Sequence, residues 1–344
     1  MKQLPVISVL MPVYNCEEFI EASIKSILNQ SFSNFEFIII DDASNDNTLK
    51  IIKELNDPRI RLVEKTKNSG YSNSLNIGLK LAKGEFIARM DGDDISILNR
   101  FEKQLAFMKT HPEVIVCGTG YSVIGNEQIK LNPEMHEQIK LGLLRGNCIV
   151  HPSVLMRNSV IKEYNLSYNP NMEPSEDYDF WVRLLAHGKL HNLPEVLINY
   201  RVHGNSVSRK KAKQQESNAA LAKINLLEYL GLELSIEEKH LLKKIFKKFS
   251  SLTIKELKKA GVILKRVENS NVNFFQRDGF QDYLQYLQEM IFFKFINRYE
   301  RYNPAIFLNY MKIKDDWDIK LDRYQELKLL MKSFLYYRVK YSEN

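Results

Sequence analysis

Residues 6–90 alternate between apolar, β-branched runs and segments with helical periodicity, and this alternation narrows the fold more than any other feature. Strands are predicted at Val6–Val13 and Phe35–Ile40, and over the stretches "IRLVEK" and "EFIARM". Helices with apolar residues at 3–4 spacing are predicted between them, the first over about Glu17–Gln30. Because alternating strands and helices build a mostly parallel sheet flanked by helices, the sequence predicts an α/β fold.

Three of these strands end in residues that suit ligand binding, namely Tyr14-Asn15, Asp41-Asp42 and the acidic stretch Asp91–Asp94. In open α/β sheets, ligands bind outside the carboxyl ends of the strands. A single strand that ends in aspartate carries little information. Three such ends in one sheet indicate a binding site.

The acidic stretch "RMDGDD" crowds Asp91, Asp93 and Asp94 directly behind an apolar run. Carboxylates this close raise each other's pKa and destabilise the fold unless solvent or a cation compensates. The chain has no GxGxxG after its first strand and no P-loop, so nucleotide phosphates need another source of positive charge. We therefore predict that Asp91 and Asp93 hold Mg²⁺ or Mn²⁺. The alternative is a solvated acidic loop before a helix at Leu98–Thr110.

Charge divides the chain into two parts. Residues 1–208 carry 22 Lys and Arg against 25 Asp and Glu, whereas residues 209–344 carry 27 against 17, a net charge of +10. The three cysteines show no CxxC or zinc spacing and are expected to be buried thiols in a reducing compartment. No apolar run reaches the ~18 residues of a membrane span, so we predict a cytoplasmic protein.

The second part is predicted to be entirely helical, with a domain boundary between residues 1–212 and 213–344. Ser235 and Glu238 have the spacing of a capping box. The aromatic-rich stretch Tyr283–Tyr310 is interpreted as a helical core. Its alternatives are a subunit interface of a homo-oligomer and a surface that meets the inner membrane or a glycolipid, since basic helices attract anionic lipid. Nucleic-acid binding is not expected, because no recognition motif accompanies the charge.

Six segments together resemble the family 2 glycosyltransferases, which have the GT-A fold. They occur in the family order within residues 5–208, as "VLMPVYN", "FIIIDDASNDNT", "GEFIARMDGDD", "HPSVLMR", "SEDYDFWVRL" and "YRVHGNSVS". Within the family, the chain resembles bacterial lipooligosaccharide and capsule β-glycosyltransferases. The resemblance implies an inverting, metal-dependent enzyme that moves a hexose or N-acetylhexosamine from a UDP-sugar to a saccharide or glycolipid acceptor.

The resemblance also implies roles for individual residues. The nucleotide would be bound by Pro12, Tyr14, Asp42 and Asp91, with Asp42 bonding the uracil edge and Asp91 facing ribose or metal. Asp93 would coordinate the cation, and His203 would contact the metal or the pyrophosphate. The catalytic base would be Asp177 in "SEDYD". Acceptor or phosphate contacts are suggested for Glu176, His151 and Arg89.

Structural interpretations stand beside these roles. Asp42 suits a helix cap, Asp177 suits the first turn of a helix, Arg89 a salt bridge and His203 a structural hydrogen bond. Two other functions also stay open. A sugar-nucleotide pyrophosphorylase shares carboxylate-held Mg²⁺, but it carries a glycine-rich basic loop where this chain has the acidic "YNCEEF". A non-catalytic subunit of the same fold is the other alternative.

Overall fold

The computed structural model describes residues 4–204, 210–247, 252–296, 302–314, 321 and 323–338. They divide into two units, Met1–Ala219 and Ala220–Asn344, each with its own contacts. The predicted domain boundary at residues 212/213 stays a prediction.

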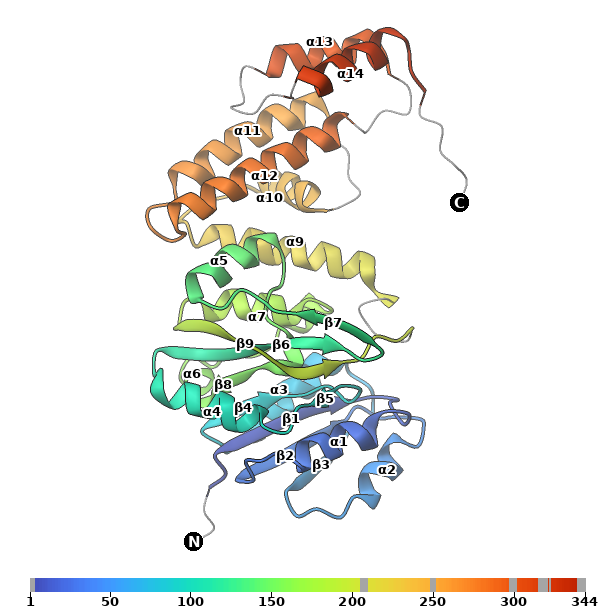
Figure 1. The fold of residues 1–344 in the computed structure, drawn as a ribbon, viewed down its shortest axis with the longest axis vertical. Helices are drawn as coiled ribbons and strands as arrows, with labels where there is room; N and C mark the ends of the chain where they lie inside the picture. Colours follow the sequence, from blue (N-terminus) through green and yellow to red (C-terminus); the bar gives the residue numbers. More distant parts are fainter. Residues whose placement is uncertain are drawn as a thin grey trace. The chain divides into compact units, whose positions relative to one another are not determined.

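A nine-stranded sheet forms the centre of the first unit (Figure 1). Its strand order is β3-β2-β1-β4-β8-β6-β9-β5, with β7 paired to β6. The four strands at one end are mutually parallel: β1 Ile7–Val13, β2 Phe35–Asp41, β3 Ile60–Glu64 and β4 Phe86–Arg89. The remaining strands pair in both directions: β5 Ile95–Ser96, β6 Val114–Val123, β7 Asn126–Lys130, β8 Leu155–Arg157 and β9 Lys189–Tyr200.

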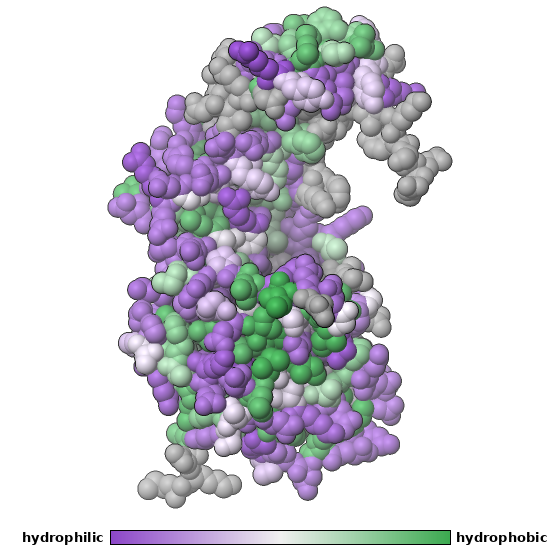
Figure 2. All heavy atoms as spheres, in the orientation of Figure 1, coloured by the Kyte–Doolittle hydropathy of each residue, from purple (hydrophilic) through white to green (hydrophobic). Residues whose placement is uncertain are grey.

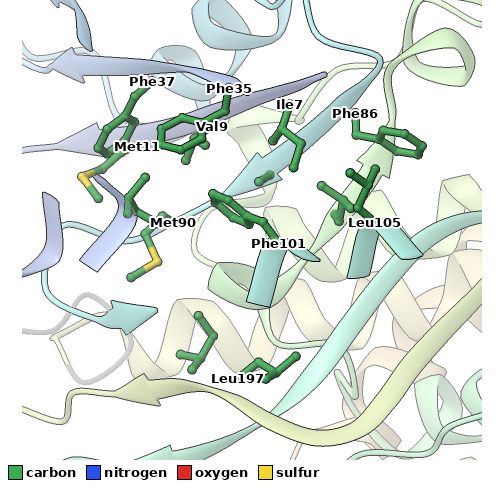
Figure 3. Packing of buried hydrophobic residues seen from close by; sticks show 14 of the residues in the cluster. Ile7, Val9, Met11, Phe35, Phe37, Phe86, Met90, Phe101, Leu105 and Leu197 are labelled. Carbon is green, nitrogen blue, oxygen red and sulfur yellow. The ribbon is translucent and has the colours of Figure 1, made fainter. Parts of the chain in front are cut away.

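Helices pack on both faces of the parallel strands. The core on one face joins alternate residues of β1 and β2 to three helices, α1 Ile20–Leu28, α2 Thr48–Glu54 and α4 Arg100–Thr110. Figure 3 shows Phe101 and Leu105 of α4 close to Ile7 and Val9. On the other face lies α3 (Tyr71–Leu81), which approaches so closely that a Cβ at Gly78 would lie 3.1 Å from Leu10 Cδ2. The other helices of this unit include α5 His136–Arg145, α6 Asn158–Glu163 and α7 Glu176–Leu184.

The predicted α/β fold is confirmed, with two differences in detail. The sheet is mixed, because β8 runs antiparallel to both of its neighbours, β4 and β6. The first helix begins at Ile20 rather than near Glu17. Glu17 instead belongs to a turn, in which its carboxylate accepts a hydrogen bond from Asn47 N at 2.8 Å and its N–H donates to Asp46 at 3.1 Å.

The second unit is helical, as predicted. Its helices are α9 Ala212–Glu228 (which begins in the first unit), α10 Ile236–Phe246, α11 Ile254–Asn269, α12 Arg277–Ile296, α13 Pro304–Ile313 and α14 Arg323–Phe334. The capping box of Ser235 and Glu238 is present at the start of α10. Among the described residues, no helix is both long enough and apolar enough to cross a bilayer.

The aromatic-rich stretch divides between core and surface. Tyr283, Phe292, Tyr302 and Tyr310 are buried, and Phe307 is half-buried, which agrees with a helical core. Two further rings are exposed, Tyr286 and Phe293. Two others fall outside what the structure describes, namely the side chain of Phe295 and the whole of Tyr299.

Candidate active site

Three carboxylates gather where β4 ends. One ligand oxygen from each of Asp91, Asp93 and Asp94 lies within 4.8 Å of the others. Asp94 is fully buried, and Asp91 forms an ion pair with the buried guanidinium of Arg89. Asp94 and the Asp91 oxygen that pairs with Arg89 are therefore not freely solvated, in contrast to the alternative of a solvated acidic loop.

The segment that follows β9 is bound to this cluster. Arg201 N donates to Asp94 Oδ1 at 2.7 Å, and Arg201 Nε donates to the Asp93 carbonyl oxygen at 2.8 Å. His203 Nε2 lies 2.9 Å from Asp93 Oδ2. The Phe19 ring supports both side chains, with the Arg201 guanidinium 4.5 Å and the His203 ring 5.2 Å from its centroid. The structure thus brings together the two residues predicted to bind metal, Asp93 and His203.

The electrostatics of the cluster fit a divalent cation. Burial, together with the charges of Asp91 and Asp93, raises the pKa of Asp94 well above its usual range. Burial also raises the pKa of Asp91, although Arg89 opposes this shift. Asp94 Oδ2 is buried and has no hydrogen-bond partner within the described ranges. Three crowded carboxylates with an unpaired oxygen are a hard-oxygen donor set of the kind that Mg²⁺ and Mn²⁺ prefer.

Asp42, which follows β2, is buried and held by three donors. Its Oδ1 accepts from Lys65 Nζ and from Ser69 N at 3.0 Å, and its Oδ2 accepts from Gly70 N at 2.9 Å. Gly70 is the N-cap residue of α3, so Asp42 caps α3 rather than the helix that follows it in sequence. The neighbouring Asp41 has a buried Oδ1 with no hydrogen-bond partner in the described part of the chain.

Asp177 lies in the first turn of α7. Its Oδ2 accepts a hydrogen bond from Asn147 Nδ2 at 2.7 Å, and its Oδ1 accepts from Tyr178 N, also at 2.7 Å. Burial raises the pKa of Asp177 to about 6, while Tyr178 N–H, the Arg89 charge and Asn147 act in the opposite direction. A carboxyl group with a pKa near neutrality is suited to accept a proton during a reaction.

Glu176 is the centre of a buried chain of polar groups. Tyr71 Oη donates to its Oε2 at 2.9 Å, and His151 Nδ1 lies 3.5 Å from its Oε1. The other ring nitrogen of His151 lies 3.0 Å from Tyr168 Oη. His151 and Glu176 therefore contact each other, and both side chains are buried.

The positive charge of Arg89 acts on this chain of groups as well as on the carboxylate cluster. Burial and the adjacent Asp177 raise the pKa of Glu176 to about 8, and the charge of Arg89 opposes both. Burial, and then Arg89, hold the pKa of His151 well below its usual range. Both shifts favour the uncharged forms of Glu176 and His151. Since Arg89 also pairs with Asp91, one cation acts on the carboxylates of both groups.

Pro12 and Tyr14 occupy different environments at this end of the sheet. Pro12 is buried within β1, whereas Tyr14, just beyond the strand, is 45% exposed. The Tyr14 hydroxyl lies 3.5 Å from Asn45 Nδ2. Tyr14 therefore presents a ring to solvent where a base could stack, and Pro12 supports the strand beneath it.

Sequence reasoning did not assign roles to several residues of this site. Two of them could have been found from their positions at the carboxyl ends of strands. Asp94 belongs to the acidic stretch, and Lys65 ends the strand "IRLVEK". Asn147 and Tyr71 carried no such signal, because their contacts join segments that are 30 and 105 residues apart in sequence.

Comparisons with known proteins identify the family of the chain. The family model "Glycosyl transferase family 2" matches residues 8–181. An uncharacterised glycosyltransferase of Haemophilus influenzae is 32% identical, over 78% of this chain and 85% of the relative. The Escherichia coli enzyme WfaP, a UDP-Glc:alpha-D-GlcNAc-diphosphoundecaprenol beta-1,3-glucosyltransferase, is 30% identical over 67% of this chain and 88% of its own length.

Solved structures share the fold at low sequence identity. The structure of residues 1–349 of Staphylococcus aureus TarS in complex with UDP-GlcNAc has a TM-score of 0.60 and 17% identity. The match covers 91% of this chain and 93% of that one. The predicted fold, a GT-A sheet with a helical C-terminal region, is thereby confirmed. The chain belongs to glycosyl transferase family 2.

Proposed function

We propose that this protein is an inverting, metal-dependent glycosyltransferase that moves a hexose or N-acetylhexosamine from a UDP-sugar to a sugar hydroxyl. The observation that carries this proposal is the presence of two carboxylate groups, the first of which is paired with the buried Arg89. One group, Asp91, Asp93 and Asp94, suits a cation. The other, Glu176 and Asp177, contains a carboxyl group whose pKa lies close to neutrality.

The relatives support a role in building a bacterial surface glycan, such as lipooligosaccharide or capsule. By its name, WfaP of Escherichia coli transfers glucose from UDP-Glc to a GlcNAc-diphosphoundecaprenol acceptor. The TarS structure contains UDP-GlcNAc. We propose a UDP-sugar donor and a saccharide or glycolipid acceptor for this chain, with transfer on the cytoplasmic side. The family match does not favour a pyrophosphorylase or a non-catalytic subunit.

Asp91, Asp93 and Asp94 would hold Mn²⁺ or Mg²⁺, with His203 next to Asp93. When bound, such a cation acts as a Lewis acid for the departing pyrophosphate. An imidazole ligand suits Mn²⁺ better than Mg²⁺, so we expect Mn²⁺ to be preferred. Arg89 neutralises part of the carboxylate charge before donor arrives.

Asp177 would act as the base. The acceptor hydroxyl attacks the anomeric carbon while its proton passes to a carboxylate oxygen of Asp177. The bond from the anomeric carbon to the pyrophosphate oxygen breaks, and its electron pair leaves with UDP. Asn147 orients the Asp177 carboxylate, and the raised pKa of Glu176 favours its uncharged form beside Asp177. A single displacement assisted by one base inverts the anomeric centre, as in inverting glycosidases where water is the nucleophile.

Tyr14, Pro12, Asp42 and Asp91 would bind the nucleotide. The Tyr14 ring would stack on the base, and Asp91 would contact the ribose or the metal. Asp42 would bond the uracil edge. Asp42 already accepts hydrogen bonds from Lys65, Ser69 and Gly70. The base would therefore share an Asp42 carboxylate oxygen with one of these donors.

A transfer assay tests the proposal. UDP-GlcNAc, UDP-GalNAc, UDP-Gal and UDP-Glc are supplied with Mn²⁺ and with either galactose-ended or GlcNAc-diphosphate-lipid acceptors, and the product's anomeric configuration is read by NMR. Asp177→Asn should lower kcat ~10²–10⁴-fold with little change in donor affinity, because it keeps the shape but loses the base. Glu176→Gln is the matched control and should retain more activity, since the raised pKa of Glu176 already favours the uncharged carboxyl that Gln resembles.

Metal dependence has its own readout. Asp93→Ala should abolish both transfer and the binding of Mn²⁺ measured by electron paramagnetic resonance. Full activity in excess EDTA would contradict a metal-dependent mechanism. A product with retained configuration would contradict a single displacement.

A further inference from the structure

The last helix of the second unit, α14, carries apolar residues on two opposite faces. One face packs inward, with Leu329 and Ser333 buried. The other carries an exposed row of Tyr324, Leu327, Met331 and Leu335, which are 72%, 54%, 53% and 72% exposed. Their spacing of three, four and four residues places them along one side of a helix. A surface helix of a soluble domain usually turns a polar side outward.

This exposed row lines a shallow apolar groove rather than standing as isolated side chains. Tyr337, from the segment after α14, completes its wall, and the stems of Lys328 and Lys332 border it. On the neighbouring helix α13, Leu308 and Met311 are also exposed. Figure 2 shows hydrophobic surface gathered over the α13–α14 end of the unit. Contiguous exposed apolar surface of this kind marks an interaction site.

The charges of the described segment around the row are mainly positive. Residues 323–338 contain four basic residues, Arg323, Lys328, Lys332 and Arg338, and one acidic residue, Glu326. Glu326 forms an ion pair with Lys314 at 2.9 Å. Within residues 323–338, the apolar row is therefore flanked mainly by cations. A symmetric contact with a second copy would bring these cations against their own images, which is unfavourable.

We propose that this face of α14 docks the protein on an anionic lipid surface. Leu327, Met331 and Leu335 enter the boundary between headgroups and acyl chains, and Lys328 and Arg338 meet the phosphate groups. Tyr324 and Tyr337 combine an apolar ring with a polar hydroxyl and therefore suit the headgroup level. A basic amphipathic helix lying in the plane of the interface has this distribution of residues.

A vesicle experiment on the full-length protein tests this inference. Co-sedimentation is measured with phosphatidylglycerol vesicles and with phosphatidylcholine vesicles. We expect binding to the anionic vesicles that weakens several-fold when salt rises from about 0.05 M to about 0.5 M, because screening shortens the range of surface charges. The triple variant Leu327→Ser, Met331→Ser and Leu335→Ser should lose about tenfold or more of its binding, because the apolar face drives insertion.

The second unit offers a matched control. Ile236, Val262 and Val272 are exposed by 88%, 64% and 80% but do not belong to the row, so changing all three to serine should leave vesicle binding unchanged. A charge variant, Lys328→Gln with Arg338→Gln, should weaken binding only to anionic vesicles. Lys332 is left intact, because its ammonium lies over the Tyr302 and Tyr337 rings at 5.1 and 5.2 Å.

Several outcomes would overturn the inference. One is the absence of wild-type binding to anionic vesicles at low salt, and another is equal binding by the row variant and the control variant. A third is a lipid-free dimer, detected by light scattering, that the row variant alone converts to a monomer, since the row would then be a subunit interface. The vesicle assay needs no donor or acceptor, so its result is independent of the proposed transfer reaction.

Discussion

At the scale of single residues, Asp177 and Asn147 allow a direct test of the proposed base. A base has to be ionised to accept a proton, and burial raises the pKa of Asp177 to about 6. We therefore expect kcat/KM to rise with pH through about 6. Asn147→Ala removes a hydrogen bond that favours the charged carboxylate, so the rising limb should move up by roughly one pH unit.

The pH profile of kcat/KM in wild type and variant measures this shift. Asn126→Ala serves as the control, because the Asn126 side chain accepts a local hydrogen bond from Gln128 N, at 3.1 Å, and forms no hydrogen bond with Asp177 among the described residues. A rising limb that stays in place in Asn147→Ala would show that another group controls the rate.

The sequence pointed to residues that the structure brings together, but it did not predict their hydrogen-bond partners. Asp93 and His203 were both predicted from motifs, and they lie 2.9 Å apart. The partners of Asp42, namely Lys65, Ser69 and Gly70, were not predicted. Motifs report the type and local order of residues. Contacts across many residues depend on the tertiary arrangement, which one sequence does not specify.

At the scale of elements, the N-terminus of α3 is where Asp42, after β2, and Glu173, before α7, meet. Gly70 has a φ of +91° and donates to Asp42, and Ser72 N donates to Glu173 Oε1 at 2.9 Å. A Cβ at Gly70 would lie 3.0 Å from that same Glu173 oxygen. Two segments distant in sequence therefore cap one helix.

Gly70→Ala should lower the free energy of unfolding by more than a substitution at another glycine with a positive φ. Gly70 has a φ of +91° and a ψ of +153°, a backbone region that essentially only glycine adopts, so an alanine there costs about 1–3 kcal/mol. Glu173 also has to move away from Ser72. Gly125→Ala serves as a control for a positive φ, because Gly125 has a φ of +78° but nothing within 4 Å of its Cβ position. Chemical denaturation should show a larger loss for Gly70→Ala, and only that variant should lose donor affinity. Equal losses would mean that the contact with Glu173 is unimportant.

The elements themselves were predicted unevenly. The parallel strands β1, β2, β3 and β4 follow from local periodicity, because each apolar run is bounded by a helix or by polar residues. The other half of the sheet was not predicted in detail. In that half, β6 pairs with both β8 and β9, although these strands do not follow it directly along the chain. Local sequence patterns do not determine the register of such pairs.

At the scale of the whole molecule, the chain has two units, each with buried apolar residues of its own. Ile39 belongs to the core of the first unit, and Leu242 is fully buried in the second. Truncating a buried leucine or isoleucine to alanine costs about 2–5 kcal/mol. We therefore expect calorimetry to show two unfolding transitions. Ile39→Ala should lower the midpoint temperature of one, and Leu242→Ala should lower that of the other. A single transition that both variants lower equally would contradict two domains.

The long sequence separations within the site set a limit on when the protein can become active. Tyr71 and Glu176 are 105 residues apart, and Asp94 and Arg201 are 107 apart. Contacts between such distant segments form late, because closing long loops costs chain entropy. At synthesis rates of ~5–20 residues per second, the ribosome needs roughly 10–40 s to reach Arg201. Until then the nascent chain exposes the Asp91–Asp94 carboxylates without the segment that binds them, so translation sets the earliest moment of activity.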